Sequence, residues 1–523
     1  MKKWCKEHKK NNGDPYDLYR DGLKIYTTIN PRMQLYAEQA VAQHMSYLQK
    51  QFNQQANIKS GTIWKEFSAQ LELAVKQTDR WKNLKKEDME EEAIRKTFNE
   101  PLPMRIFAWN KNRFIDTVMT PYDSLKYHKQ TLQTGFLAVD PFTGEVKAWV
   151  GGVDFKTFKY DHVNINTKRQ VGSTIKPLLY SLAIEEAGFT PNTIVQDVQQ
   201  NFDGYGMVPN TPKTCTFQSI PMAQALAESR TCSSAYIIKQ INGNSNEAAK
   251  QFVEYLKKCN IKSDIQPYPS IALGAVEISL FEMVQAYTMF PGAGYNAQPF
   301  FINRIEDKNG NVLESYSPQR RKVIKEETAY SVVSMMQGVI QKGTGRSMYS
   351  YAVPTQSIAG KTGTTNDNSD LWFMGYTPQL LAGAWVGCDD RYIRFSDNYF
   401  GQGAHGSLPI WAYFMNKVAN DPACNLDRNA SFVKPDNLST DFNVNFVGKD
   451  SSIDLSLPDA SAEDIEAESD YSLISNNEPA AVTPVNTTPP ANKPAAPKKQ
   501  STEPKQATTP ANKPKAVMPK KKQ

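Results

Sequence analysis

The chain has 523 residues, of which 40% are apolar and 22% are charged, with a formal net charge of +6. This length and composition exclude a mini-protein and a chain that is disordered throughout, and they predict roughly three domains. Residues 481–523 contain nine Lys and one Glu, so the basic excess belongs to this segment. The remainder is nearly neutral, and its charge gives no reason to expect a nucleic-acid partner.

No run reaches the roughly 18 consecutive apolar residues that a membrane-spanning helix needs. The basic start, MKKWCKEHKKNNGD, lacks the apolar segment of a signal peptide. We therefore expect either a protein inside the cell or a chain whose N-terminal part is missing. The six cysteines and five histidines form neither a CxxC nor an HExxH motif, so we expect no metal site.

The first elements in chain order are a strand and a helix. Residues 22–30 (GLKIYTTIN) favour a short strand, and residues 32–55 have helical periodicity, so residues 1–57 form an N-terminal linker, strand and helix. Residues 58–130 are rich in Lys, Glu, Trp and Gln, which predicts a polar insertion of amphipathic helices. The charge runs of this insertion are typical of a solvated face rather than of a binding surface.

We expect the core domain over residues 131–424. Residues 135–152 alternate apolar positions around the turn sequence DPFTG, which predicts a β-hairpin. Residues 222–241 and 328–341 have helical spacing, and residues 357–364 and 379–388 resemble strands. Strands and helices mixed without strict alternation indicate an α+β fold.

The C-terminal part has a different composition. Residues 425–480 are predicted to be a low-order linker, and residues 481–523 contain nine prolines and the segment PANKP twice. Such a composition cannot offset the entropy lost on ordering a chain, so we expect an extended, disordered tail. The tail is either a solubilising segment or a contact for an anionic polymer of the cell envelope.

The strongest chemical signal is the S-x-x-K sequence from Ser173 to Lys176. Gly172 before it and the apolar residues after it predict a buried helix that begins at Ser173. The serine hydroxyl then lies at the positive end of the helix dipole, and its N–H is free to bind an oxyanion. Lys176 lies one turn further on the same face, where burial would lower its pKa and make it a base for the hydroxyl.

A second signal is the sequence Lys361-Thr362-Gly363-Thr364. The glycine lets another chain or a ligand approach the strand closely, and the lysine charge with the threonine hydroxyls makes a receptor for a carboxylate. A phosphate-binding P-loop would instead place its glycines before the lysine and a helix after it. Each motif is weak alone, because S-x-x-K also occurs at ordinary helix starts and K-T-G in hairpin turns.

Together, the two motifs resemble the signature of the active-site serine penicilloyl transferases. The chain is similar, over residues 20 to about 420, to the transpeptidase half of a class A penicillin-binding protein. Five ordered blocks carry the resemblance: DGLKIYTTI, DPFTGEVKAWVGG, RQVGSTIKP, ALGAVEISLFEM and GKTGTTNDNSDLWFMGYTP. The resemblance implies a penicillin-binding protein and β-lactamase-like fold, with helices flanking an antiparallel sheet. A membrane anchor and a glycosyltransferase domain normally precede this half, so we expect this chain to be the C-terminal part of such a protein.

The resemblance also implies a role for each motif residue. Ser173 would be the acylated nucleophile and Lys176 its base, while Ser229 would pass a proton to the leaving group. Thr364 would supply a second oxyanion N–H beside that of Ser173. The residues expected to bind substrate are Thr231, Lys361, Thr362, Gly363 and Thr364.

The third family motif, S-x-N, aligns with Ser229-Arg230-Thr231. Thr231 stands where the family has an asparagine whose amide orients the lysine and the substrate carbonyl, so we expect reduced activity. Cys215 and Cys232 flank the helix that leads to Ser229, and they either pair in an oxidising envelope or remain free thiols.

The implied function is that of a peptidoglycan D,D-transpeptidase, without a cofactor, at the periplasmic face of the cytoplasmic membrane. Its partners would be stem peptides, as D-Ala-D-Ala donors and amine acceptors, and β-lactam antibiotics, which mimic D-Ala-D-Ala. Two alternatives stay open, a D,D-carboxypeptidase and a catalytically weak penicillin-binding scaffold. A class A β-lactamase is excluded because its ExxLN motif needs a Leu-Asn dipeptide, which the chain lacks.

Overall fold

The computed structural model describes residues 1–242, 245–436, 438 and 446. These residues belong to one compact unit, Met1–Ile474. The predicted tail at residues 481–523 and most of the predicted linker at residues 425–480 lie outside the described residues. In the described part of the chain, no helix combines the length and the apolar character needed to cross a bilayer.

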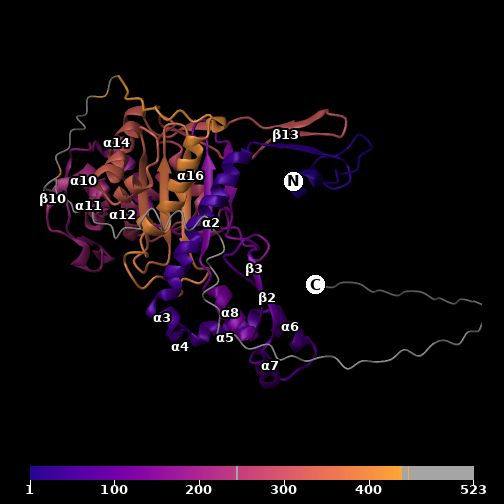
Figure 1. The fold of residues 1–523 in the computed structure, drawn as a ribbon. Helices are drawn as coiled ribbons and strands as arrows, with labels where there is room; N and C mark the ends of the chain where they lie inside the picture. Colours follow the sequence, from indigo (N-terminus) through magenta and orange to yellow (C-terminus); the bar gives the residue numbers. More distant parts are fainter. Residues whose placement is uncertain (243–244, 437, 439–445, 447–523) are drawn as a thin grey trace, which may run out of the picture. The chain divides into compact units, whose positions relative to one another are not determined.

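A five-stranded antiparallel sheet forms the centre of the unit (Figure 1). Its strands follow the order β16-β17-β18-β4-β5. Their bounds are Gln133–Val139 for β4, Val146–Val150 for β5, Ala359–Thr364 for β16, Leu371–Tyr376 for β17 and Leu381–Gly387 for β18. The predicted hairpin at residues 135–152 is β4–β5, and the strands predicted at residues 357–364 and 379–388 are β16 and β18. The predicted α+β class is confirmed.

Both faces of the sheet are buried, because alternate residues of each strand enter different hydrophobic clusters. Along β17, Trp372 and Met374 join one cluster, whereas Leu371 and Phe373 join the other. Figure 1 shows the helices on the two faces. The first cluster includes α9 (Lys176–Ala187), α13 (Leu280–Tyr287) and α14 (Glu326–Lys342), and the second includes α2 (Pro31–Gln54) and α16 (Leu408–Asn420). The sequences of β17 and β18 are therefore apolar throughout and do not alternate between apolar and polar residues.

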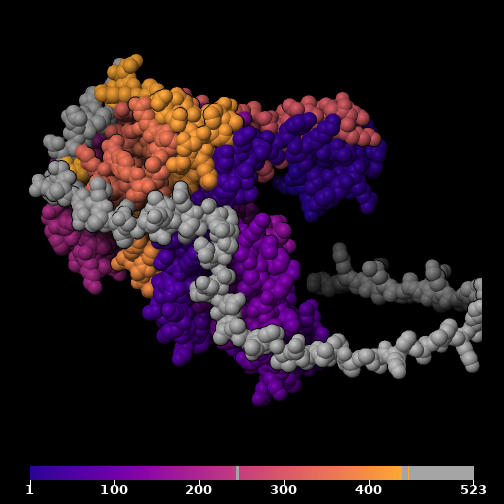
Figure 2. Space-filling view, viewed as in Figure 1, coloured from indigo at the N-terminus to yellow at the C-terminus, as the bar shows by residue number. Residues whose placement is uncertain are grey.

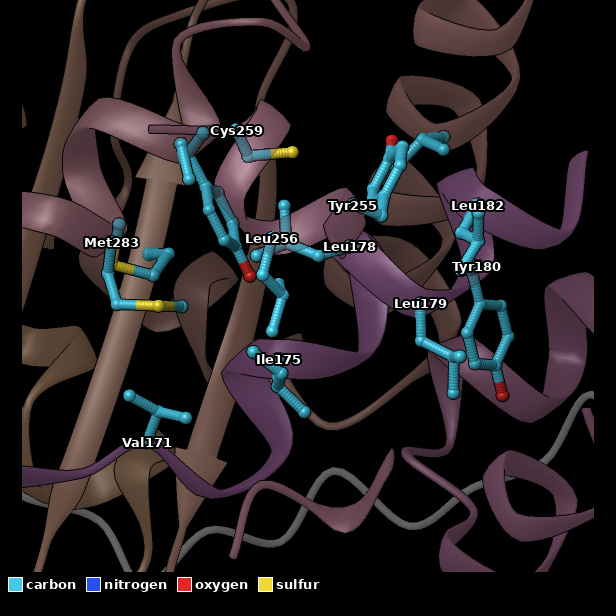
Figure 3. Packing of buried hydrophobic residues seen from close by; sticks show 14 of the residues in the cluster. Val171, Ile175, Leu178, Leu179, Tyr180, Leu182, Tyr255, Leu256, Cys259 and Met283 are labelled. Atoms are coloured by element: carbon cyan, nitrogen blue, oxygen red, sulfur yellow. The ribbon is translucent and has the colours of Figure 1, made fainter. Parts of the chain in front are cut away.

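Helix α9 is buried on almost all sides near its start. Ile175, Leu178 and Leu179 are fully buried in one hydrophobic cluster, and Figure 3 shows Leu178 next to Leu256 of α12 (Ser245–Lys258). Burying one large aliphatic side chain contributes about 1.5 to 3 kcal/mol, so this helix end is strongly fixed. Lys176 belongs to the same turn of the helix, and its side chain is therefore buried as well.

The segment between α2 and β4 contains helices, as predicted, and a hairpin that was not predicted. The helices are α3 (Ala56–Lys59), α4 (Thr62–Glu66), α5 (Ser68–Gln77), α6 (Asp79–Lys86), α7 (Glu91–Phe98) and α8 (Pro121–Lys129). The hairpin joins β2 (Leu102–Phe107) to β3 (Phe114–Met119). The sequence of this hairpin lacks a clear alternation of apolar and polar residues. One reason is that Arg105 and Asp116 are exposed and form an ion pair across the two strands.

The N-terminal residues pack against a hairpin that comes from far along the chain. β1 (Lys24–Thr27) pairs with β13 (Ile302–Glu306), which pairs with β14 (Val312–Ser315). Trp4 of α1 (Lys2–Glu7) is buried against Ile305 of β13. Figure 2 shows the indigo N-terminal residues lying against the salmon-coloured hairpin.

Short elements complete the core and surround the residues that carry the chemistry. The strands are β6 (Lys168–Gln170), β7 (Ile194–Gln196), β8 (Gln200–Phe202), β9 (Gly206–Val208), β10 (Ser219–Pro221), β11 (Glu277–Ser279), β12 (Tyr295–Ala297) and β15 (Arg320–Lys322). The helices are α10 (Met222–Ala227), α11 (Thr231–Gln240) and α15 (Gly403–Gly406), with 3-10 turns η1 (Gly172–Ile175), η2 (Pro212–Thr214), η3 (Pro269–Leu273), η4 (Arg346–Tyr351) and η5 (Pro422–Cys424).

The turn η1 is braced by the chain around Gly274. The Gly172 N–H donates to the Gly274 carbonyl at 3.2 Å, and the Val171 N–H donates to the Val276 carbonyl at 3.1 Å. Gly274 has a φ of +82°, and a Cβ there would lie 1.9 Å from the Gly172 carbonyl oxygen. Only glycine fits both the backbone conformation and the space.

We predict that Gly274→Ala destabilises the fold more than Gly188→Ala does. Gly188 has a φ of +70° but no atom within 4 Å of the place that a Cβ would occupy, so its substitution costs about 1 to 2 kcal/mol for the left-handed backbone alone. Gly274→Ala adds about 1 to 3 kcal/mol, because backbone atoms must move. Thermal unfolding midpoints of the two variants measure the difference, and equal midpoints would contradict the steric argument.

Candidate active site

Ser173 lies in the turn η1, directly before α9. The two residues that follow it are buried, whereas Ser173 itself is partly exposed. The Thr174 hydroxyl donates to the Val171 carbonyl at 2.7 Å, and the Tyr287 hydroxyl donates to the Thr174 carbonyl at 2.5 Å. These bonds fix the backbone on which Ser173 is carried. The Ser173 hydroxyl has no hydrogen-bond partner among the described residues.

Lys176 is fully buried at the first position of α9. Its Nζ donates to the Ser229 carbonyl and lies 3.4 Å from both Ser229 Oγ and Thr231 Oγ1. Burial lowers the pKa of Lys176 to about 7, while the Asp197 charge acts in the opposite direction and the Arg230 charge lowers it further. A large share of this amine is therefore unprotonated near neutral pH and can accept a proton.

Ser229 lies where two helices meet, and here the sequence prediction needs a correction. A continuous helix was predicted over residues 222–241, but α10 ends at Ala227 and α11 begins at Thr231. Ser229 has a φ of +58°, in the left-handed region. The Ser229 and Arg230 N–H groups turn back to the Leu226 and Ala225 carbonyls, which ends α10 with its last carbonyls satisfied. The apolar spacing of both helices hid this break.

Lys361 approaches Ser229 from the strand β16. It is fully buried, and its Nζ donates to Ser229 Oγ at 2.8 Å and to the Thr362 carbonyl at 2.9 Å. Burial holds the pKa of Lys361 well below its ordinary value, and the Lys176 charge lowers it further. One serine hydroxyl is thus within hydrogen-bond distance of two buried amines.

Gly363 allows β16 to lie directly against the Ser173 turn. A Cβ at Gly363 would lie 2.7 Å from Thr174 Cγ2 and 3.0 Å from the Val171 carbonyl oxygen. Thr364 follows it at the end of the strand and is only partly buried; its Oγ1 accepts from the Gly403 N–H at 3.1 Å. β16 has β17 on one side and, among the described residues, no strand on the other.

Two features at the site escaped the sequence analysis or were left open by it. The Thr362 and Thr344 hydroxyls are hydrogen-bonded at 2.6 Å, and the Thr344 N–H donates to the Ala227 carbonyl at 3.1 Å, which ties β16 to the end of α10. The only sequence signal for Thr344 is the Gly343-Thr344-Gly345 run after a helix. Cys215 and Cys232 form a disulfide with a Cα–Cα distance of 5.5 Å, at the start of α11.

The structure therefore brings together most of the residues that the sequence analysis selected. Lys176, Ser229, Thr231 and Lys361 form one hydrogen-bonded group, and the Lys-Thr-Gly strand packs on the turn that carries Ser173. The structure does not show a hydrogen bond between Ser173 and Lys176. An amine of lowered pKa suits acyl transfer to a serine, and so do a serine hydroxyl without a hydrogen-bond partner and a strand with one open side, both as judged over the described residues.

Comparisons with known proteins agree with this chemistry. Residues 134–386 match the family described as penicillin binding protein transpeptidase domain, and residues 49–132 match the penicillin-binding protein middle domain. Penicillin-binding protein 1A of Aquifex aeolicus is 28% identical over 415 residues, which are 76% of this chain and 54% of that protein. The chain thus spans about half the length of this curated relative.

Two solved structures share the fold. A crystal structure of penicillin-binding protein 1A from Haemophilus influenzae has a TM-score of 0.58 and 18% identity, and the match covers 82% of this chain and 70% of that one. The PonA1 protein from Mycobacterium tuberculosis in complex with penicillin V has a TM-score of 0.52 and 20% identity, and covers 80% of this chain and 90% of that one. This chain therefore contains a penicillin-binding protein middle domain followed by a penicillin-binding protein transpeptidase domain, and it is similar to penicillin-binding protein 1A.

Proposed function

We propose that this chain is a peptidoglycan D,D-transpeptidase that forms peptide cross-links through an acyl-enzyme on Ser173. The observation that carries the proposal is the buried Lys176, whose pKa is lowered to about 7 one turn after a serine hydroxyl that no protein group engages among the described residues. Both groups adjoin the Lys-Thr-Gly strand. This combination supplies a base and a nucleophile without a metal or a cofactor.

In the first step, Ser173 Oγ attacks the carbonyl carbon of the penultimate D-Ala, and its proton passes to the neutral amine of Lys176. The N–H groups of Ser173 and Thr364 would stabilise the oxyanion that forms. As the bond to the terminal D-Ala nitrogen breaks, that nitrogen takes up the proton. Ser229 suits the transfer, because its Oγ lies within hydrogen-bond distance of the Lys176 and Lys361 amines.

The strand β16 would hold the donor peptide by its terminal carboxylate. Lys361, Thr362, Gly363 and Thr364 are the residues proposed to bind it, and Thr344 supports them through the Thr362 hydroxyl. Burial and the nearby Lys176 charge hold the pKa of Lys361 well below its ordinary value, because no carboxylate of the described residues accompanies the amine. An arriving carboxylate would raise that pKa again, because a nearby negative charge favours the ammonium form.

In the second step, an amine on a neighbouring peptidoglycan strand attacks the acyl carbon, the Ser173 ester bond breaks, and Ser173 recovers its proton. Attack by water instead would give the D,D-carboxypeptidase reaction, so product analysis with a donor stem peptide separates cross-linking from hydrolysis. β-Lactams would acylate the same serine, and the PonA1 protein, which shares the fold, has been solved in complex with penicillin V. We place this activity in the cell envelope, where the basic tail would be either a solubilising segment or a contact for an anionic polymer.

We predict that benzylpenicillin acylates wild-type protein at Ser173 and that Ser173→Ala is not acylated. Removing the hydroxyl removes the only atom that would bond to the lactam carbonyl carbon, while the buried turn around it is retained. Intact-mass spectrometry measures the penicilloyl adduct, and the thermal unfolding midpoint of Ser173→Ala checks that it is folded. An adduct on the variant, or none on the wild type, would contradict the assignment of Ser173 as the nucleophile.

The second prediction concerns Lys176 as the base. The acylation rate should rise with pH through about 7, because the amine accepts the Ser173 proton only when it is unprotonated. Lys176→Arg, which cannot lose its proton at accessible pH, should be slower by about two to four orders of magnitude. Stopped-flow acylation with a fluorescent penicillin measures both effects. A rate for Lys176→Arg within tenfold of wild type would point to a different base.

The third prediction is that Thr231 slows the reaction. Thr231 Oγ1 lies 3.4 Å from Lys176 Nζ, at the long end of a hydrogen bond, whereas an asparagine amide reaches further and can also donate to a substrate carbonyl. One charge-assisted hydrogen bond contributes about 1.5 to 3 kcal/mol, or one to two decades in rate. Thr231→Asn should therefore raise the second-order acylation rate constant about tenfold or more.

Ser229→Ala is the matched variant for this comparison and should lower the same constant, because it removes the hydroxyl between the two amines. Gel-based acylation kinetics on the three proteins would decide the question. If Thr231→Asn is acylated as fast as wild type or more slowly, the inference that Thr231 slows acylation is wrong.

A further inference from the structure

Asp197 is a fully buried carboxylate just after β7, and it joins two segments that are remote from it in sequence. Its Oδ2 accepts from the Thr216 N–H at 3.0 Å and from the Thr216 hydroxyl at 2.8 Å. Its Oδ1 accepts from the Ser233 N–H and the Ser233 hydroxyl, both at 3.0 Å. All four donors are neutral, so hydrogen bonds rather than a salt bridge hold both oxygens of the carboxylate.

The bonds to Ser233 cap α11. Ser233 is the third residue of α11, and the residue before the helix, Arg230, gives no side-chain cap. The third N–H of a helix needs an acceptor from outside the helix, and a capping oxygen typically contributes about 1 kcal/mol. Asp197 supplies that acceptor from another part of the chain. The start of α11, with Thr231 at its first position, therefore depends on Asp197.

The bonds to Thr216 hold a second segment against the same helix end. Cys215, next to Thr216, forms the disulfide with Cys232, next to Ser233. The Phe217 N–H donates to the Asp197 carbonyl at 3.0 Å, although Phe217 is exposed and has a φ of +61°. Residues 215–217 are thus joined to the start of α11 both by the disulfide and through Asp197.

We propose that Asp197 is a positioning residue of the active site: its carboxylate fixes the start of α11 and thereby places Ser229 and Thr231 against the Lys176 amine. This inference rests on the proposed transpeptidase function. Asp197 touches no reacting atom, and its effect passes through the α10–α11 junction.

The charge of Asp197 provides a readout that a purely structural role would not move. The charged groups that face Lys176 are Lys361 from β16, Arg230 from the α10–α11 junction and Asp197. Arg230 is itself paired with Glu228, at 2.6 Å. Asp197 favours the ammonium form of Lys176, and Arg230 disfavours it. Removing either charge should displace the pH dependence of acylation, in opposite directions.

The first experiment compares the pH profile of fluorescent-penicillin acylation in wild type, Asp197→Asn and Arg230→Gln. The acid limb of the profile is the pH range over which the acylation rate rises as Lys176 loses its proton. We expect the acid limb of Asp197→Asn to move to lower pH and that of Arg230→Gln to move to higher pH, each by about half a unit or more. We also expect the plateau rate of Asp197→Asn to fall about tenfold, because Ser229 and Thr231 lose their fixed place. An unchanged acid limb in Asp197→Asn would contradict the inference that the Asp197 charge acts on the Lys176 amine.

The second experiment does not depend on acylation. Amide hydrogen exchange over residues 226–236 should become about tenfold faster in Asp197→Asn, whose amide group presents an N–H where the carboxylate accepted one. Glu282→Gln is the matched control, because Glu282 is a buried capping carboxylate of another helix, α13, and accepts from the Ser263 N–H at 2.9 Å. It should leave exchange over residues 226–236 and the acid limb unchanged.

Unchanged exchange in Asp197→Asn, or an equal increase in Glu282→Gln, would overturn the positioning role. If Asp197→Asn does not fold, Thr216→Val removes one of the four hydrogen bonds and should show a smaller change of the same sign. If wild type is not acylated at all, the proposed function fails, while exchange still decides whether Asp197 fixes the start of α11.

Discussion

The site depends on two lysine side chains buried beside one serine hydroxyl. Each ammonium loses its hydration, and each positive charge opposes the other, so the site does not readily hold both charges without an anion. The pKa of both amines is thereby lowered, and a carboxylate ligand beside Lys361 would favour its ammonium form again. The left-handed Ser229, the interrupted helix and the tight packing of β16 on the serine turn all serve to make this arrangement fit.

The sequence pattern predicted the elements whose apolar residues mark the faces that the elements bury. The β4–β5 hairpin has a turn sequence between apolar strands, and α14 has a long amphipathic repeat, so both follow from their own residues. The break at Ser229 is different, because residues on both sides have helical spacing and only the backbone conformation of one serine separates them. The β2–β3 hairpin escaped for a related reason: its exposed ion pair carries little information about burial.

Motif spacing selected side chains that lie together at the candidate site, but not the residues that hold them in place. Lys176, Ser229, Thr231 and Lys361 lie within one hydrogen-bonded group, as their motifs implied. Asp197 and Thr344 act through tertiary hydrogen bonds, and neither belongs to a motif. Within the described part of the chain the Ser173 hydroxyl has no hydrogen-bond partner, and hydrogen bonds of active sites often tighten only when substrate is bound.

The placement of β16 at the edge of the sheet has a consequence for association between molecules. An edge strand exposes unpaired backbone groups and is a template on which a strand of another copy can add, which is a route to aggregation. Natural proteins discourage this with short edge strands and with charges that point inward. β16 has six residues, two of them glycines, and its lysine is buried. Five of those six residues are buried, so this short edge offers little accessible backbone to a strand of a second copy.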